Sequence, residues 1–293
     1  MSAALALARE PDLPYRIVDE PNGTHFAVWG PFLLRSAFQP LFRFRNGKLA
    51  IAGVEGLIRP MLNGAPVMPG SFFRSIERHE LRMVETLCRT LHILNATKFR
   101  RDRIKLFLNF DPSALADKAR FAETLSGIGA DLRAAGLKPS SVVCEITEHR
   151  ASSEADLKHF VYLLRAEGYQ VAIDDFGAKS SDLGRVEALT PDIVKFDGRW
   201  ATRLMDTRAG YGLLKLMVTW FADRGIPSVI EGVETRWQLE LSEACGAAYV
   251  QGFGLARPQT VPVDFRAFLD SAREITDWPD EPVRVPDRAR RFG

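Results

Sequence analysis

From residue 38 onward, short apolar runs alternate with longer segments whose apolar positions recur at helical spacing. The short runs predict strands near 37–44, 49–57, 104–109, 142–147, 170–175, 192–196, 226–231 and 248–252. The longer segments predict helices near 71–97, 113–136, 152–168, 180–188, 199–224, 235–246 and 262–274. Eight strands with helices between them are typical of a closed α/β barrel. Uninterrupted apolar runs such as 171–173 fit strands that are covered on both faces.

The first strand pair and the two ends of the chain depart from this pattern. Asn46-Gly47 is a hairpin signal between the first two strands, which predicts that they run antiparallel. Residues 1–30 are interpreted as an N-terminal extension in which Asn22-Gly23 turns a small hairpin. We therefore expect a barrel domain over 31–275 and a disordered tail, rich in prolines and charges, over 276–293.

Most of the predicted strands end on a polar side chain, and this pattern is the most informative about function. The residues at these ends are Glu55, Asn109, Glu145, Asp174, Asp175, Lys195, Glu231 and Gln251. The carboxyl ends of barrel strands meet at one mouth, where the reactive groups of such barrels lie. A buried strand has no local reason to finish on a carboxylate, so we expect these side chains to converge around a shared positive charge.

The chemistry of these side chains favours a divalent metal site. They offer oxygen ligands without thiolate or imidazole, a set that suits Mg²⁺ or Mn²⁺ better than zinc or copper. Two carboxylates about 4 Å apart repel by roughly 4 kcal/mol at an effective dielectric near 20. The acids in this set face a single lysine, so two divalent ions would nearly neutralise them. Such ion pairs are the usual apparatus for attack of water on a phosphodiester.

Taken singly, these residues have ordinary explanations that stay open. Asp174-Asp175 also fits a cap of the next segment or a pair of partners for arginines. Lys195 also fits a strand-end lysine whose amine reaches solvent, and Asn109 and Gln251 fit loop hydrogen bonding. Only the joint pattern favours a functional site.

Composition excludes several classes of function. The net charge of +2, from 39 basic and 37 acidic residues, does not indicate a protein that coats a nucleic acid polymer. Three scattered cysteines predict buried thiols in a reducing compartment, without a disulfide framework or a zinc knuckle. No apolar run approaches the ~18 residues of a membrane span. The apolar start at 3–8 lacks a basic leader, so we expect a cytoplasmic protein without a signal peptide.

Eight short motifs follow one another along the chain, each occurring once. They are Gln39-Pro40, Glu55-Gly56-Leu57-Ile58-Arg59, Asn109-Phe110-Asp111-Pro112, Glu145-Ile146-Thr147-Glu148, Asp174-Asp175-Phe176-Gly177, Lys195-Phe196-Asp197, Glu231-Gly232-Val233-Glu234 and Gln251-Gly252-Phe253. Together they resemble the EAL domain family, bacterial phosphodiesterases that hydrolyse cyclic di-GMP to linear pGpG. The resemblance runs from Phe38 to Pro258 and implies a modified TIM barrel, (β/α)8, whose first strand is antiparallel.

The resemblance also implies roles for individual residues. The metal ligands, for two Mg²⁺ or Mn²⁺ ions, would be Glu55, Asn109, Glu145, Asp174 and Asp175. The catalytic groups would be Glu55 with Lys195, which orients water or stabilises the transition state, and Glu231, a metal-associated acid or general base. The substrate-binding residues would be Gln39, Leu57, Arg59 and Gln251. Glu148, Glu234 and Asp197 would support the site from behind, although Glu148 and Glu234 also fit simple surface charges.

Two departures from the family pattern bear on activity. Gly56 replaces the alanine of the E-A-L signature, and we expect this loss of one methyl group beside the ligand to be tolerated while adding backbone freedom. The segment Ala178 to Leu183 replaces the family's T-G-Y/F-S-S/A-L loop and is expected to alter metal affinity, regulation or turnover. It also weakens the analogy by which a homodimer would be expected, and leaves open control by a regulatory protein partner.

Two hypotheses of function follow from these features. The first is a phosphodiesterase specific for cyclic di-GMP. The second is a cyclic di-GMP receptor or protein-interaction module that hydrolyses slowly or not at all, which the altered loop would favour. Retention of a competent residue at every expected metal and water position favours the enzyme.

Overall fold

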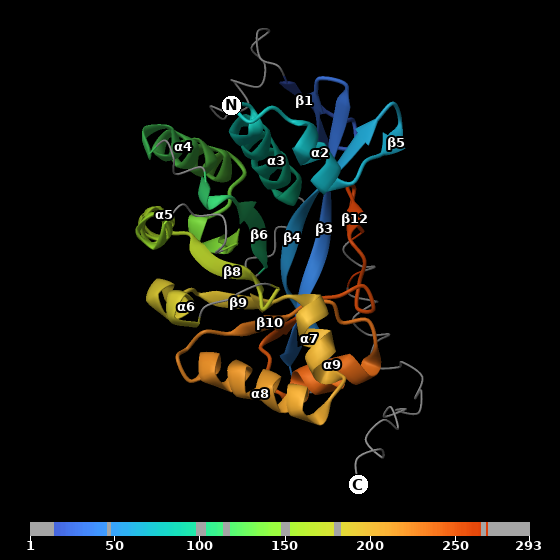
Figure 1. The fold of residues 1–293 in the computed structure, drawn as a ribbon. Helices are drawn as coiled ribbons and strands as arrows, with labels where there is room; N and C mark the ends of the chain where they lie inside the picture. Colours follow the sequence, from blue (N-terminus) through green and yellow to red (C-terminus); the bar gives the residue numbers. More distant parts are fainter. Residues whose placement is uncertain are drawn as a thin grey trace.

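A computed structural model of the chain describes residues 15–45, 48–97, 104–113, 118–147, 153–178, 183–264 and 268. Within these residues eight strands close into a barrel (Figure 1). They are β3 (Phe32–Arg45), β4 (Lys48–Leu62), β6 (Lys105–Phe110), β7 (Val142–Thr147), β8 (Gln170–Phe176), β9 (Ile193–Phe196), β10 (Ser228–Ile230) and β11 (Tyr249–Val250). Their order around the barrel is β3-β11-β10-β9-β8-β7-β6-β4, and pairing of β3 with β4 completes the circle.

Strand direction matches the expected variant of the α/β barrel. β3 runs antiparallel to both neighbours, β4 and β11, whereas β4 and β6 to β11 are parallel to one another. The prediction of a modified TIM barrel with one antiparallel strand is confirmed. The hairpin turn predicted at Asn46-Gly47 lies outside the described residues, and Arg45 and Lys48 pair on either side of it.

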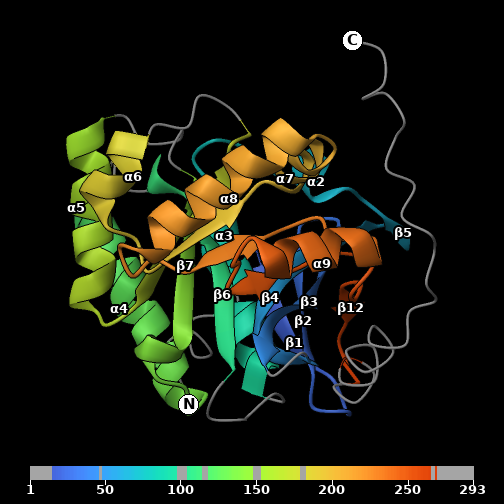
Figure 2. The same cartoon turned by 90° about the horizontal axis from the view of Figure 1, so that it is seen from below.

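The helices lie outside the barrel strands, where their apolar faces cover the sheet (Figures 1 and 2). They are α2 (Pro69–Ser75), α3 (Leu81–Ala96), α4 (Lys118–Ala134), α5 (Glu154–Ala166), α6 (Leu183–Leu189), α7 (Gly198–Met205), α8 (Arg208–Ala222) and α9 (Arg236–Ala244), with a 3-10 turn at Pro139–Ser141. No helix in these described ranges is long and apolar enough to cross a membrane. Cys88, Cys144 and Cys245 are buried free thiols, as expected.

Two of the predicted helices were wrong in extent. The segment 71–97 forms two helices, because Ile76 takes an extended conformation (φ −84°, ψ 133°) after α2. The segment 199–224 also divides, because Thr207 is extended and its hydroxyl accepts a hydrogen bond from Gly210 N at 3.0 Å, which starts α8 anew. Of the helix predicted at 262–274, only the first residues and Phe268 lie in the described part of the chain.

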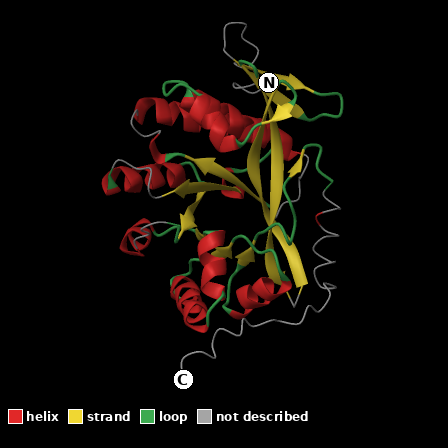
Figure 3. Cartoon of the chain, turned by 45° about the vertical axis from the view of Figure 1, so that its right-hand side comes forward, coloured by secondary structure: helices red, strands yellow, loops and turns green. Residues whose placement is uncertain are grey.

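At one end of the barrel, further strands continue the same sheet beyond the closed circle of eight. β1 (Tyr15–Asp19) and β2 (His25–Trp29) form the predicted hairpin, and β2 pairs with the first residues of β3. β5 (Ala65–Pro66) pairs with the end of β4, and β12 (Gln259–Thr260) joins β3. The long β3 and β4 cross the molecule from these added strands to the end near α9 (Figures 1 and 3). Ala27, Trp29, Leu34 and Ile58 pack with α2 and α3 in a core of their own, so the hairpin is part of the folded unit.

The inside of the barrel is filled at its amino end by a separate apolar cluster, which we call the plug. It consists of Leu41, Phe107, Val143, Ala172, Ile193 and Val229, with Tyr249 packed against it. β4 contributes Gly53 at this level, where an added Cβ would lie 2.5 Å from the Phe107 ring. The ring therefore occupies the space that a side chain on β4 would take, and filling by side-chain layers is usual in such barrels.

Candidate active site

A polar layer lies directly above the plug because side chains on a strand alternate between two faces. On each parallel strand, the residue at the level of the plug is followed two positions later by a polar residue on the same face. On the antiparallel β3 the polar residue comes two positions earlier. These residues are Gln39, Glu55, Asn109, Glu145, Asp174, Lys195, Glu231 and Gln251. The strand-end pattern found in the sequence is therefore a single layer at the mouth of the barrel.

Lys195 lies at the centre of this layer and is 1% exposed. Its ammonium group contacts four carboxylates carried by different strands or strand ends. The distances from Nζ are 2.5 Å to Glu145 Oε1, 2.7 Å to Glu231 Oε1, 3.1 Å to Asp174 Oδ1 and 3.6 Å to Glu55 Oε2. Lys195 supplies one positive charge where the acids converge, and four carboxylates surround it.

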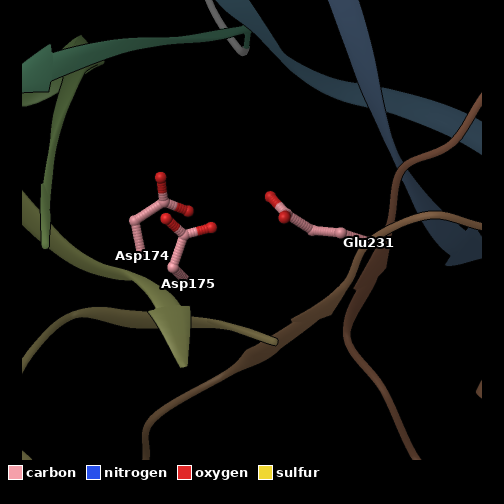
Figure 4. A group of neighbouring side chains, drawn as sticks. All are labelled: Asp174, Asp175 and Glu231. Atoms are coloured by element: carbon pink, nitrogen blue, oxygen red, sulfur yellow. The ribbon is translucent and has the colours of Figure 1, made fainter. Parts of the chain in front are cut away.

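Asp174 and Asp175 reach the same site although they are adjacent on one strand. Regular β-structure would point them to opposite faces. The register between β8 and β9 shifts between Ile173 and Phe176, and Asp175 has a positive φ of 56°. This bulge turns both carboxylates toward Glu231 (Figure 4). Asp174, Asp175 and Glu231 each offer an oxygen, and these oxygens lie within 4.8 Å of one another.

The two glutamines of the layer hold other parts of the site. Gln251 Nε2 donates a hydrogen bond to Glu55 Oε2 at 2.8 Å, so this carboxylate is fixed from across the β3 strand. Gln39 Nε2 donates to Ala256 O at 3.2 Å and ties β3 to the loop that follows β11. Both glutamine side chains are buried.

The surroundings of the acids shift their pKa values in the direction expected when one lysine does not balance them. Burial raises the pKa of Glu145 well above its usual value, with repulsion from Glu55 adding to the effect. Burial also raises the pKa of Glu231 to about 8 and raises that of Asp175. Burial lowers the pKa of Lys195, but the surrounding carboxylates outweigh it and hold that pKa well above its usual value. The layer therefore favours the uptake of further positive charge.

The oxygen atoms of the layer fit a divalent cation site. Among the described residues, Glu145 Oε2 and Gln251 Oε1 are buried without a hydrogen-bond partner, while Glu145 Oε1 and Asp174 Oδ1 share the single ammonium group of Lys195. Buried acceptors are normally satisfied, so these atoms point to a missing positive group. Carboxylate and amide oxygens are the ligands that Mg²⁺ and Mn²⁺ prefer. The residues present therefore fit the expected cations.

Asn109 is exposed, as is Asp175 among the proposed ligands, and the structure shows how the Asn109 backbone is held. It lies beside Glu145 in the register of β6 and β7. Its carbonyl oxygen accepts a hydrogen bond from Arg89 Nη1 of α3 at 3.2 Å, and the Arg89 guanidinium lies 4.7 Å from the centre of the Phe110 ring. Arg89 is buried and was not singled out from the sequence, where it is one of two arginines in α3.

The remaining predicted residues divide into three groups. Leu57 and Arg59 follow Glu55 at two-residue steps on β4, and burial lowers the pKa of Arg59. The Asp197 carboxylate caps α7 by accepting a hydrogen bond from Trp200 N at 2.8 Å, and Glu234 is exposed just before α9. Glu148 and residues 179–182 of the altered loop lie outside the described residues.

The surroundings of Gly56 differ from our expectation. Its missing side chain would not lie beside a ligand but would face outward to α3, where an added Cβ would be 2.9 Å from His92 Cγ. The expected gain in backbone freedom is therefore opposed by a packed aromatic ring.

Comparison with known proteins identifies the family. The sequence model of the EAL domain matches residues 33–258. The chain is 31% identical over 124 residues to a probable cyclic di-GMP phosphodiesterase, PdeA, of Escherichia coli; the match covers 42% of this chain and 17% of PdeA. It therefore spans a small part of that relative's length.

Solved structures share the fold. The Klebsiella pneumoniae BlrP1 complex with manganese and cyclic di-GMP at pH 9.0 matches with a TM-score of 0.70 and 24% identity, covering 84% of this chain and 59% of that one. A standalone EAL protein of Vibrio cholerae O395, bound to cyclic di-GMP, matches with a TM-score of 0.66 and 26% identity, covering 77% and 92%. With its family match over most of its length, the chain belongs to the EAL domain family.

Proposed function

We propose that this protein is a metal-dependent phosphodiesterase that hydrolyses cyclic di-GMP to linear pGpG. The observation that carries the proposal is the polar layer, in which four carboxylates surround one buried lysine at the mouth of an EAL barrel. Complexes of BlrP1 hold cyclic di-GMP with manganese or with calcium, which supports both the ligand and the class of cation.

Two Mg²⁺ or Mn²⁺ ions would be held by Glu55, Asn109, Glu145, Asp174 and Asp175. When bound, such ions supply Lewis-acid stabilisation and an activated water. The four carboxylates around Lys195 carry more negative charge than this lysine balances, and Glu145 Oε2 is buried without a hydrogen-bond partner, which supports the binding of further positive charge.

The chain's own residues then have separate tasks. Lys195 places a fixed positive charge where negative charge develops on the phosphoryl oxygens. Glu231 is the candidate general base, because burial raises its pKa and so makes its carboxylate a stronger proton acceptor than an ordinary glutamate. Attack of the water oxygen on phosphorus breaks one phosphodiester bond of the ring and leaves pGpG. Gln39, Leu57 and Arg59 would contact the dinucleotide along β3 and β4, and Gln251 would orient Glu55 or bound water.

The first test is incubation of the purified protein with cyclic di-GMP and Mg²⁺ or Mn²⁺, with pGpG followed by chromatography. We expect metal-dependent product that Glu55→Ala abolishes. Glu187→Ala is the matched control, because Glu187 pairs with Arg224 near the amino ends of β8 and β9, away from the mouth. Unchanged turnover in Glu55→Ala would remove the metal site from the proposal.

The same assay separates the second candidate function. The altered sequence of the loop after Asp174-Asp175-Phe176-Gly177 favours a receptor that turns over slowly. Binding of cyclic di-GMP without pGpG formation would support this receptor. We also propose a cytoplasmic setting, which buried free thiols suit, and a homodimer by family analogy, which light scattering would test.

A further inference from the structure

The signature glycine of this chain is packed against a histidine of the neighbouring helix. Gly56 lies on the outer face of β4, between Glu55 and Leu57, which face the mouth. An added Cβ would lie 2.9 Å from Cγ and 3.1 Å from Cδ2 of His92, and 3.1 Å from Leu108 Cδ2. Real Cβ atoms almost never come within 3.0 Å of another heavy atom, so an alanine would require β4 or the ring to move.

The His92 ring is held firmly in this position. It is 4% exposed and meets the Phe38 ring edge-on, with centroids 6.0 Å apart. His92 Nδ1 is hydrogen-bonded to Ser36 Oγ at 2.9 Å, and Ser36 Oγ also accepts from Asn95 Nδ2 at 3.1 Å. Burial lowers the pKa of His92 to about 3, so the ring stays neutral at physiological pH.

The same network reaches the N-terminal hairpin. Asn95 Oδ1 accepts a hydrogen bond from His25 N, and Asn95 Nδ2 donates one to His25 O, both at 2.9 Å. The hairpin over residues 15–29 precedes the family match, which begins at residue 33. The support of His92 therefore comes partly from a segment that lies outside the matched family region.

We propose that His92 is a positioning residue for the cation site: its ring takes the place of a side chain at residue 56 and fixes β4 so that Glu55 reaches its partners. This rests on the proposed cation site. Glu55 Oε2 lies 2.8 Å from Gln251 Nε2 and 3.6 Å from Lys195 Nζ. Ligand distances in metal sites lie within about 0.2 Å of their standard values, so we expect a shift of β4 by a few tenths of an ångström to weaken binding.

The test is a cycle of four proteins: wild type, Gly56→Ala, His92→Ala and the double variant. Mn²⁺ binding is measured by calorimetry and Tm by scanning calorimetry. We expect Gly56→Ala to weaken Mn²⁺ affinity by about tenfold, in the range for groups that orient metal ligands. In the His92→Ala background the same substitution should have little effect or improve affinity, because the methyl group then has space. Gly212→Ala, at an exposed glycine of α8 with nothing near its Cβ, is the matched control.

Each other outcome overturns the inference. Unchanged Mn²⁺ affinity in Gly56→Ala, or a lower Tm without a change in affinity, would show that the contact is only structural. An equal loss in both backgrounds would remove His92 from the explanation. If Gly56→Ala fails to fold, Ser36→Ala serves instead, because it removes the hydroxyl that holds the ring; unchanged affinity in that variant would refute the inference. The experiment measures cation binding and does not depend on hydrolysis. If the protein binds Mn²⁺ but does not hydrolyse cyclic di-GMP, the proposed function is refuted, while the role of His92 can still be tested.

Discussion

Replacement of Lys195 by methionine would remove the central charge of the polar layer while keeping most of the side-chain volume. The ammonium lies 2.5 to 3.6 Å from four carboxylates. At an effective dielectric near 20, each such contact corresponds to about 5–7 kcal/mol of attraction, before the cost of burial is subtracted. Without the lysine these acids face only one another, so the cation-free variant must take up protons or lose stability.

The affinity for Mn²⁺ and the turnover of cyclic di-GMP should respond differently to this substitution. Divalent ions relieve the repulsion that the variant creates, so Mn²⁺ affinity should be retained or increased and Tm should rise more on addition of Mn²⁺ than in wild type. Turnover should fall by about 10²–10³-fold or more, because a fixed positive charge aimed at the reacting phosphoryl group is lost. Lys215→Met, at an exposed lysine of α8, is the matched control.

The assay combines pGpG formation at saturating Mn²⁺ with scanning calorimetry in the presence and absence of Mn²⁺. Near-normal turnover in Lys195→Met would refute the assignment of the lysine to transition-state stabilisation. Loss of Mn²⁺ binding in this variant would refute the electrostatic reasoning, since it would mean that the lysine organises the ligands more than it competes with the cation.

Three further predictions concern the layer and its supports. Burial raises the pKa of Glu231 to about 8 in the cation-free site, so Mn²⁺ binding should release protons and strengthen as pH rises toward that value; calorimetry in buffers of different ionisation enthalpy that showed no release would contradict this. Arg89→Met should leave the Asn109 carbonyl without its donor and cost about 1–3 kcal/mol of unfolding free energy, with weaker Mn²⁺ binding; urea denaturation and calorimetry would measure both, and unchanged values would sink the assignment. Gly53→Ala should destabilise the plug by about 1–3 kcal/mol because its methyl group meets Phe107, and Phe107→Leu should recover part of the loss in urea melts; a neutral Gly53→Ala would show that the plug repacks freely.

The barrel and the ends of its strands could be predicted because each strand has a recognisable pattern of apolar and polar residues within a few positions. Apolar runs of strand length and the polar residue that ends each run depend on alternation within one strand, as Val143 and Glu145 illustrate. The confirmed antiparallel strand depended on a two-residue turn signal. Helix extent was harder, since the interruptions at Ile76 and Thr207 occur within sequence of continuous helical character.

Contacts between distant segments could not be read from these patterns. Gly56 and His92 are 36 positions apart, and nothing in either neighbourhood indicates that the ring of one fills the space of the other. The same holds for Arg89 and the carbonyl of Asn109. The Asp174-Asp175 pair was recognised, but the positive φ that turns both carboxylates to one side is a property of the bulge between β8 and β9.

The plug lies below the polar layer, so we expect the layer to be reached from the mouth of the barrel. The six core members of the plug are at most 5% exposed, so they fill the described part of the barrel at its amino end. Cations, protons and the dinucleotide would then all use the mouth, and a dinucleotide lying across it would trap whatever cations had entered before. We therefore expect an order of events in which cations load first and a chelator removes them slowly while the dinucleotide stays bound.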